Sequence, residues 1–279
     1  VYTGRTAAIF DILDGLFREF FLIKYKARDI KTPSIISSNV IKKAGYFETG
    51  CQHISFVAPI SNDPYILEEF SKISDYSSVN LFKYLKTPKD VLNPAMCLHC
   101  YPLFENHTLD EPIKVMTLMG SCFRDESGNL NNSERLNEFK MREVVYFGEE
   151  QLLKIIHNEL IDFLINFGKF FELNFKLEVS NDIFFNDNAE KQLFSQLITN
   201  NKIEFQVYIK DLNKYIACAS INKHGSHFSE AFNIKGSTGD FASTMCIGFG
   251  LDRLYLALGT GLEKNQLKYL TEKLLRNGV

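Results

Sequence analysis

Two arginine-containing segments of the sequence could bind a polyanion. Residues 120–126 read Gly-Ser-Cys-Phe-Arg-Asp-Glu, and Arg124 and Glu126 stand two residues apart at the end of an expected strand, so their side chains project from one face. The planar guanidinium of Arg124 could bind a phosphate group. After a polar loop, Arg135 could cover the other end of a polyanion and Phe139 could stack on a flat ring. The pattern predicts a nucleotide-binding hairpin, although alone it is more typical of a solvated one.

The second segment, residues 246–254, reads Cys-Ile-Gly-Phe-Gly-Leu-Asp-Arg-Leu. Gly248 and Gly250 permit close approach of the backbone where a strand leads into a helix. Arg253 then falls in the first helical turn. Taken alone, this pattern is more typical of a tight strand-to-helix turn than of a nucleotide site.

The elements that must position these segments are visible in the spacing of apolar residues. Helical spacing predicts helices over residues 9–20, 38–43, 152–167, 252–258 and 267–275, and Gly168 is expected to end the third of them. An extended segment over residues 24–31 runs into Pro33. Further strands are predicted over residues 51–58, 114–123, 139–147, 204–208, 216–221 and 228–234. The whole chain, residues 1–279, is therefore expected to be one α+β domain with a largely antiparallel sheet.

Composition excludes several classes of protein. The chain has 279 residues, of which 45% are hydrophobic and 23% charged, with a formal net charge of −3; this is ample for a globular core. No apolar run reaches the roughly 20 residues of a membrane span, and no recognisable signal peptide is present, so we expect a cytoplasmic protein. Six cysteines favour free thiols or metal ligands over a disulfide scaffold. The small net negative charge, without a dominant run of Lys and Arg, makes a large nucleic-acid partner such as tRNA unexpected.

The order of the patterns resembles the three signature motifs of class II aminoacyl-tRNA synthetases: a helix and extended segment ending in proline, a Phe-Arg-x-Glu hairpin, and Gly-x-Gly-x-x-Arg. The resemblance covers nearly the whole chain and implies the class II fold, an antiparallel sheet flanked by helices. It also implies that Pro33 marks the interface of a homodimer.

The same resemblance implies roles in binding ATP with Mg²⁺. Arg124 would hold the α-phosphate, Arg253 would meet the γ-phosphate, Glu126 and Arg135 would help bind the nucleotide, and Phe139 would stack on adenine. Adenylation needs positive charge distributed in this way, because a carboxylate attacks the α-phosphorus while pyrophosphate leaves.

Within class II, the match is closest to seryl-type enzymes, with two departures. Only a short helix precedes Pro33, so the long N-terminal arm that grips tRNA in seryl enzymes is not expected. Cys97, Glu143 and Cys246 stand near the second and third motifs, and this trio resembles the ligands of the zinc-dependent, methanogenic-type seryl enzymes and their truncated relatives, the amino acid:[carrier protein] ligases. Two thiolates and a carboxylate leave a fourth position open on Zn²⁺, where the amino group of the substrate would bind. Cys100 or His99 could replace Cys97.

Two further stretches resemble strings found in the carrier-protein ligases: residues 181–185, Asn-Asp-Ile-Phe-Phe, and residues 220–228. By this resemblance Ser220 and Asn222 belong near the substrate and ATP, and Glu204 near the substrate or Mg²⁺.

Two other features of this region bear on the site. Ile216 stands where seryl enzymes carry a metal-binding glutamate, which leaves open how Mg²⁺ is held. His224 and His227, considered by themselves, are more typical of surface histidines than of catalytic ones.

The function implied is ATP-dependent conversion of a small amino acid to its aminoacyl-AMP and transfer to the phosphopantetheine thiol of a carrier protein. One alternative is a truncated seryl-type ligase that uses tRNA or another acceptor. A second alternative, from a different class, is a regulatory paralogue without catalytic activity, against which the retained Arg124, Glu126, Phe139 and Arg253 argue.

Overall fold

Two long neighbouring strands, β5 (Ile113–Phe123) and β6 (Glu138–Gly148), form the centre of the fold. The computed structural model describes residues 2–126, 134–180 and 202–258, with four further positions: Lys268, Tyr269, Glu272 and Arg276. Within that part of the chain the main sheet has seven strands in the order β1-β5-β6-β10-β9-β8-β7. Every neighbouring pair is antiparallel except β1 and β5, which are parallel. The predicted antiparallel α+β fold is confirmed.

The other strands of the main sheet are β1 (Arg28–Ile30), β7 (Phe175–Val179), β8 (Lys202–Ile209), β9 (Lys214–Gly225) and β10 (Ser243–Gly250). The helices are α1 (Gly4–Tyr25), α2 (Ser38–Lys43), α3 (Tyr46–Thr49), α4 (Pro64–Ser71), α5 (Glu150–Phe170), α7 (His227–Phe232) and α8 (Leu251–Leu258).

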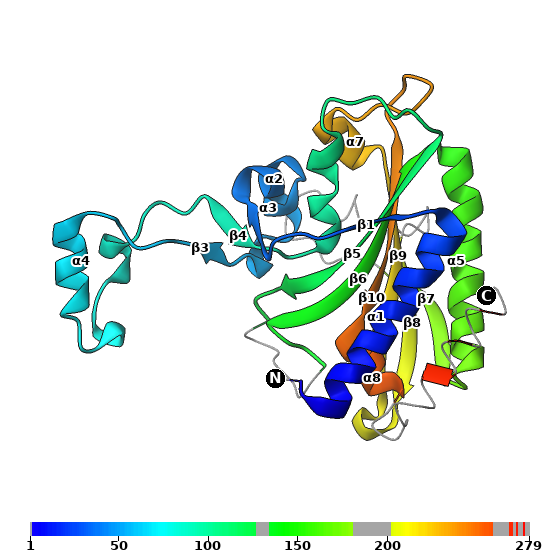
Figure 1. The fold of residues 1–279 in the computed structure, drawn as a ribbon, viewed down its shortest axis with the longest axis horizontal. Coiled ribbons are helices and arrows are strands. Elements are labelled where there is room, and N and C mark those ends of the chain that lie inside the picture. Colours follow the sequence, from blue (N-terminus) through cyan, green and yellow to red (C-terminus); the bar gives the residue numbers. More distant parts are fainter. Residues whose placement is uncertain are drawn as a thin grey trace.

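Both faces of the sheet are covered, which explains why its central strands are continuous apolar runs instead of alternating ones. In β6, Val144 and Tyr146 belong to a core shared with α1, α5 and α8, whereas Val145 and Phe147 face a second core. Figure 1 shows α1 and α5 along one side of the sheet, and α2, α3 and α7 on the other.

The core under the long helices is built from aromatic rings. Phe17 of α1 stacks on Phe249 of β10 with 3.9 Å between the ring centroids, and Phe163 of α5 packs edge-on against the same ring of Phe249 at 6.1 Å. These contacts fix both helices to the strand that leads into α8.

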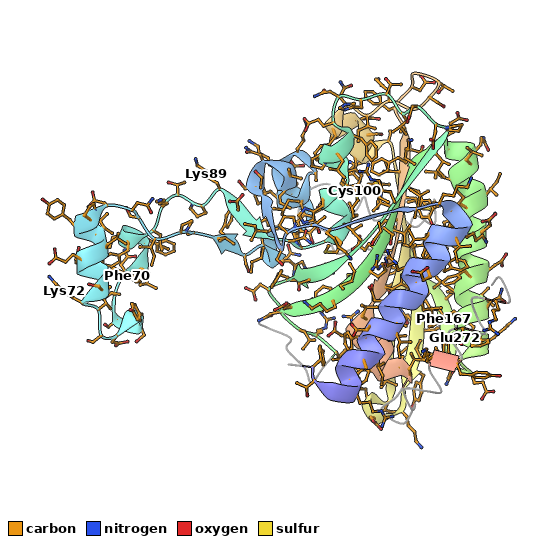
Figure 2. The ribbon with its side chains drawn as sticks, viewed as in Figure 1. Phe70, Lys72, Lys89, Cys100, Phe167 and Glu272 are labelled. Atoms are coloured by element: carbon orange, nitrogen blue, oxygen red, sulfur yellow. The ribbon has the colours of Figure 1, made fainter. Side chains whose placement is uncertain are left out.

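The second core lies under short helical turns and a small sheet. Strands β2 (Ile35–Ser37), β4 (Asp90–Leu92) and β3 (Phe56–Val57) pair in that order. Two 3₁₀ turns, η4 (Met96–His99) and η5 (Tyr101–Phe104), follow β4 and pack on the main sheet. In Figure 2, Cys100 lies on this side of the sheet and Phe167 on the side of α5.

A lobe formed by residues 58–89 stands away from the main sheet (Figure 1). Its helix α4 begins at Pro64, with Asp63 as the N-cap, and Phe70 packs against the ring of Tyr84 at 5.4 Å within the lobe. Tyr65 and Phe82 are 83% and 84% exposed. The sequence did not predict this extension, and Figure 2 shows Phe70 and Lys72 far from the sheet.

Most of the predicted elements are confirmed, and three details were wrong. Residues 228–234 form helix α7 instead of a strand, because Phe228 and Phe232 also fit helical spacing and Asn233 ends the helix with φ 51°. Residues 51–58 contribute only the two-residue strand β3, since the chain turns away into the lobe. Gly168 does not end α5, which continues to Phe170.

Two expectations lie largely or wholly outside the described residues: the helix over residues 267–275 and the segment 181–185. In the described part of the chain, no helix is long and apolar enough to span a membrane.

Candidate active site

The predicted nucleotide-binding hairpin is present as β5 and β6. Cys122 of β5 pairs with Phe139 of β6, so Arg124 leaves the end of β5 beside that ring, with its guanidinium carbon 5.3 Å from the centroid. Arg124 also donates through Nε to the backbone oxygen of Pro94 at 3.1 Å. Arg135 Nη1 lies 2.7 Å from Glu126 Oε2. The hairpin therefore brings together the four residues predicted for nucleotide binding.

Arg253 joins this hairpin from the first turn of α8. Its Nε donates to the backbone oxygen of Glu134 at 3.1 Å and its Nη1 to that of Ala217 at 3.0 Å, which fixes the plane of the guanidinium. Burial lowers the pKa of Arg253, and the positive charges of Arg124 and Arg135 act in the same direction. Three guanidinium groups thus share one electrostatic field, as expected where a polyanion binds.

Gly248 allows β10 to approach its neighbours closely. A Cβ atom at Gly248 would lie 2.9 Å from Met141 Cε, the far end of a flexible side chain, and 3.5 Å from Glu143 Cγ, which is ordinary contact. At Gly250 the nearest atom would be the Cys218 backbone oxygen at 3.5 Å, which is also ordinary contact. A side chain at Gly248 would therefore require Met141 to move, whereas one at Gly250 would not displace a neighbour.

Cys97, Glu143 and Cys246 converge. Their ligand atoms all lie within 4.8 Å of one another and all three residues are buried. Cys97 comes from the η4 turn, Glu143 from β6 and Cys246 from β10. This arrangement matches the trio predicted from segments far apart in the sequence, and its sulfur and carboxylate donors are those that Zn²⁺ prefers.

The three groups of this cluster perturb one another. Glu143 accepts backbone N–H groups of Met96 at 3.3 Å and Cys97 at 2.9 Å, yet burial raises its pKa to about 7. A hydrogen bond with Cys97 lowers the pKa of Cys246 well below its usual value, and the same contact raises that of Cys97. Bringing two sulfurs and a carboxyl group together in a buried site therefore leaves negative charge that a cation would neutralise.

Cys100 and His99 lie beside this cluster, but neither belongs to the group within 4.8 Å. Cys100 is fully buried, and burial raises the pKa of its thiol. His99 Nε2 is buried and has no hydrogen-bond partner among the described residues, and burial lowers the pKa of His99 to about 4.

Strands β8 and β9 extend the site along the sheet. Ser220 pairs with Gly248 on one side and with Glu204 on the other, and Asn222 pairs with Cys246. Directly opposed residues project from the same face, so Ser220 and Glu204 share a face with the cluster. Asn222 Nδ2 donates to Ser220 Oγ at 3.1 Å and lies 3.6 Å from Cys246 Sγ.

The oxygen groups on β8 and β9 differ in what they contact. Glu204 accepts from Gln206 Nε2 at 3.0 Å and lies 3.5 Å from Lys202 Nζ. Ile216 is buried in the core under the long helices, so it contributes no oxygen ligand for Mg²⁺.

Sequence reasoning undervalued His224. Its Nε2 lies 3.7 Å from Cys246 Sγ, whereas His227 is exposed, with its Nε2 3.3 Å from the backbone oxygen of Ala44. The sequence feature that could have identified His224 is its position two residues after Asn222, on the strand that neighbours Cys246.

A family model for the tRNA synthetase class II core domain (G, H, P, S and T) matches residues 85–260. The chain belongs to this family. The matched residues include both arginine segments, the Cys-Glu-Cys cluster and the β8–β9 residues, so every predicted site residue lies within the class II core.

Relatives of this class II core include two kinds of ligase. A type-2 serine–tRNA ligase from Methanocaldococcus jannaschii is 27% identical over 262 residues, covering 90% of this chain and 50% of that protein. An amino acid–[acyl-carrier-protein] ligase from Bradyrhizobium diazoefficiens is 24% identical over 261 residues, covering 91% of this chain and 76% of that protein. The chain spans about half the length of the serine–tRNA ligases it matches.

The class II fold is also evident in solved structures. A crystal structure of M. kandleri SerRS in complex with A. aeolicus tRNASec superposes with a TM-score of 0.82 at 24% identity, covering 98% of this chain and 56% of the other. The predicted resemblance to methanogenic-type seryl enzymes and carrier-protein ligases is confirmed at the level of family and fold.

Proposed function

We propose that this class II core is an ATP-dependent ligase that activates a small amino acid as its aminoacyl-AMP. The observation that carries the proposal is the convergence of Cys97, Glu143 and Cys246 within 4.8 Å on the sheet that also presents Arg124 and Arg253. A cluster whose donors suit a cation, on the same sheet as a group of arginine side chains, fits a substrate that carries both an amine and a carboxylate and reacts with ATP.

In the first step, a carboxylate oxygen of the amino acid attacks the α-phosphorus of ATP, the bond to the bridging oxygen breaks, and pyrophosphate leaves. Arg124 would hold the α-phosphate and Arg253 the γ-phosphate, and Mg²⁺ bound with ATP would supply further positive charge. Phe139 would stack on adenine, while Glu126 and Arg135 orient the nucleotide. No general base is required, because the carboxylate is already a nucleophile, and fixed positive charge stabilises the transition state.

The Cys-Glu-Cys cluster fits Zn²⁺ because its donors are two sulfurs and a carboxylate, buried together and short of one tetrahedral ligand. When bound there, the ion would supply a Lewis-acidic position for the substrate amine. The backbone N–H groups of Met96 and Cys97 hold Glu143 in place. Selection for an amine would thus come from the metal.

In the second step, the thiol of a phosphopantetheinylated carrier protein attacks the carbonyl carbon, the acyl–phosphate bond breaks, and AMP leaves. Support comes from the relative named as an amino acid–[acyl-carrier-protein] ligase, of which this chain spans 76%.

The decisive experiment uses two assays. Amino-acid-dependent ATP–pyrophosphate exchange, run with and without chelator, identifies the activated amino acid. Radiolabelled amino acid is then offered to a holo carrier protein and to bulk tRNA in parallel, with the apo carrier as control. Label on the holo carrier alone supports the proposal, whereas label on tRNA and not on the carrier overturns it.

The alternative acceptor is tRNA, and one observation favours testing it: the structurally similar SerRS was solved with tRNASec. The same labelling assay separates the two acceptors. A regulatory paralogue without catalysis would show no exchange with any amino acid, an outcome that the cluster of three arginines argues against.

We further propose that the active unit is a homodimer in which Pro33 lies at the interface. β1 is an edge strand of the main sheet, and the segment that follows it exposes Pro33 and leaves Ile35 42% exposed. Light scattering on the purified chain at micromolar concentration tests this, and a monomeric mass would contradict it.

A further inference from the structure

His224 occupies an irregular position in the sheet. Thr244 of β10 pairs with Gly225 of β9, but Met245 pairs with Lys223, so His224 is the extra residue of a β-bulge. Bulges often redirect a side chain next to a functional site. Here the bulge is adjacent to the Asn222–Cys246 pair, on the face of the sheet that carries the Cys-Glu-Cys cluster.

The imidazole of His224 is held on several sides. Its Nδ1 faces two hydroxyl groups, Tyr101 Oη and Thr244 Oγ1, each at 3.4 Å. Phe228 packs against the ring in a T-shaped contact with 4.9 Å between centroids, and Tyr101 stacks on Phe228 at 4.3 Å. The ring is therefore fixed with Nε2 directed at Cys246 Sγ, 3.7 Å away.

The hydroxyl group of Tyr101 bears on which nitrogen carries hydrogen. A neutral imidazole has one N–H donor and one acceptor nitrogen. Thr244 Oγ1 donates to the backbone oxygen of Gly225 at 3.3 Å, whereas Tyr101 can donate its O–H to Nδ1, which favours the tautomer with hydrogen on Nε2. That hydrogen then points at the sulfur of Cys246. Asn222 Nδ2 approaches the same sulfur at 3.6 Å, so two N–H groups point toward the sulfur of Cys246.

His224 approaches Cys246 from outside the cluster of ligand atoms. The group of described residues whose donor atoms all lie within 4.8 Å contains Cys97, Glu143 and Cys246 but not His224. An N–H directed at a ligating sulfur fixes its orientation and withdraws charge from it, and loss of such outer contacts typically weakens metal binding.

We propose that His224 is a positioning residue of the metal centre, which orients the Cys246 sulfur through Nε2–H while Tyr101 and Thr244 hold the ring. The inference rests on the metal site of the proposed function. It adds a residue that acts through Cys246 instead of touching the metal or the substrate.

The test measures metal binding directly, without ATP or an acceptor. Apo protein is titrated with Co²⁺, the sulfur-to-cobalt charge-transfer and ligand-field bands are recorded, and Zn²⁺ affinity is obtained by competition with a chromophoric chelator. We expect His224→Ala to weaken Zn²⁺ binding by about 10- to 100-fold while the cobalt spectrum stays that of a two-sulfur site. His224→Gln, which keeps a side-chain N–H donor, should recover part of the loss.

Two further variants keep the test interpretable. His227→Ala, three residues along the chain and exposed, should bind Zn²⁺ like the wild type. Tyr101→Phe leaves the imidazole in place but removes one hydroxyl that faces Nδ1. It should weaken Zn²⁺ binding less than His224→Ala does, and it tests the inference even if His224→Ala folds poorly.

Three results would overturn the inference. The first is wild-type affinity in both His224→Ala and Tyr101→Phe. The second is a loss in His224→Ala as large as that of Cys97→Ser with a changed coordination number, which would make His224 a ligand. The third is a wild-type chain that activates an amino acid but binds no metal. A chain that binds metal with the expected His224 dependence but activates no amino acid would instead refute only the proposed reaction.

Discussion

The carboxylate of Glu143 is hydrogen-bonded at 2.9 Å to the backbone N–H of Cys97, so one member of the cluster holds the turn that carries another. This contact connects the centre of the sheet to the η4 turn. It also means that removal of Glu143 would disturb Cys97, and the three members should be tested one at a time.

Replacing any member of the cluster should remove the metal. We expect Cys97→Ser, Glu143→Gln and Cys246→Ser each to lower Zn²⁺ affinity by more than the 10- to 100-fold typical of outer contacts, measured as bound zinc per chain by atomic emission. Cys51→Ser is the matched control, because Cys51 is exposed. Full zinc occupancy in Cys246→Ser would contradict the site.

Arg253 should be essential for activation and not replaceable by lysine. Its guanidinium is fixed by two backbone oxygens at 3.1 and 3.0 Å, a geometry that an ammonium group does not reproduce. Arg253→Lys should therefore lower the rate of ATP–pyrophosphate exchange by about 10²- to 10³-fold. The exposed Arg28 offers a control in Arg28→Lys, and equal rates in the two variants would refute the role of Arg253.

Two helical glycines should respond to alanine in opposite directions. At Gly168 a Cβ would lie 2.5 Å from the ring of Phe175, whereas at Gly15 nothing lies within 4 Å. Gly168→Ala should lower the free energy of unfolding by about 1–3 kcal/mol through overpacking, and Gly15→Ala should raise it by up to about 1 kcal/mol. Urea unfolding followed by circular dichroism measures both, and a stabilised Gly168→Ala would disprove the tight contact.

Stability should fall in acid partly because of Asp29. Burial opposes ionisation of Asp29, but hydrogen bonds from Arg18 and Arg142 prevail and lower its pKa in the folded chain. The unfolded chain then binds more protons, so the contribution of Asp29 is complete above the unfolded pKa of about 4 and disappears as pH falls through the folded pKa.

The measurement is the urea midpoint as a function of pH between 3 and about 6. Asp29→Asn should be less stable near neutral pH and should lose less stability on acidification than the wild type. Asp11→Asn, at an exposed position of helix α1, should follow the wild-type curve. Parallel curves for wild type and Asp29→Asn would show that the ion pairs do not contribute.

Elements with strong local signals could be predicted from the sequence. Residues 38–43 were expected to be helical and form α2, with Ser37 as N-cap, and the segments of β5 and β6 were placed within a residue or two. The strand predicted over residues 228–234 was wrong because their apolar spacing fits both the helical and the strand period. Only tertiary packing decides between the two. The lobe was missed although Asp63 and Pro64 form a typical helix start, because local patterns do not show that a segment stands away from the sheet.

The candidate site was predicted from the order of the motifs and their resemblance to class II synthetases, on residue types that suit the chemistry. Arginine, cysteine and glutamate at motif positions identified the hairpin, the turn and the cluster. His224 was not predictable, because its contact with Cys246 depends on a one-residue bulge between β9 and β10. Residue types and spacing do not reveal such a bulge, since register is set by pairing with the neighbouring strand.

The Cys-Glu-Cys cluster also has a consequence for biosynthesis. Its members come from η4, β6 and β10, so a growing chain cannot complete the cluster until Cys246 has left the ribosome. Until then Cys97 and Glu143 lack their third partner, and the Cys97 thiol is open to oxidation. The proposed metal could therefore bind with all three residues only after β10 has been synthesised. Its binding would then be a late step that stabilises strands already paired.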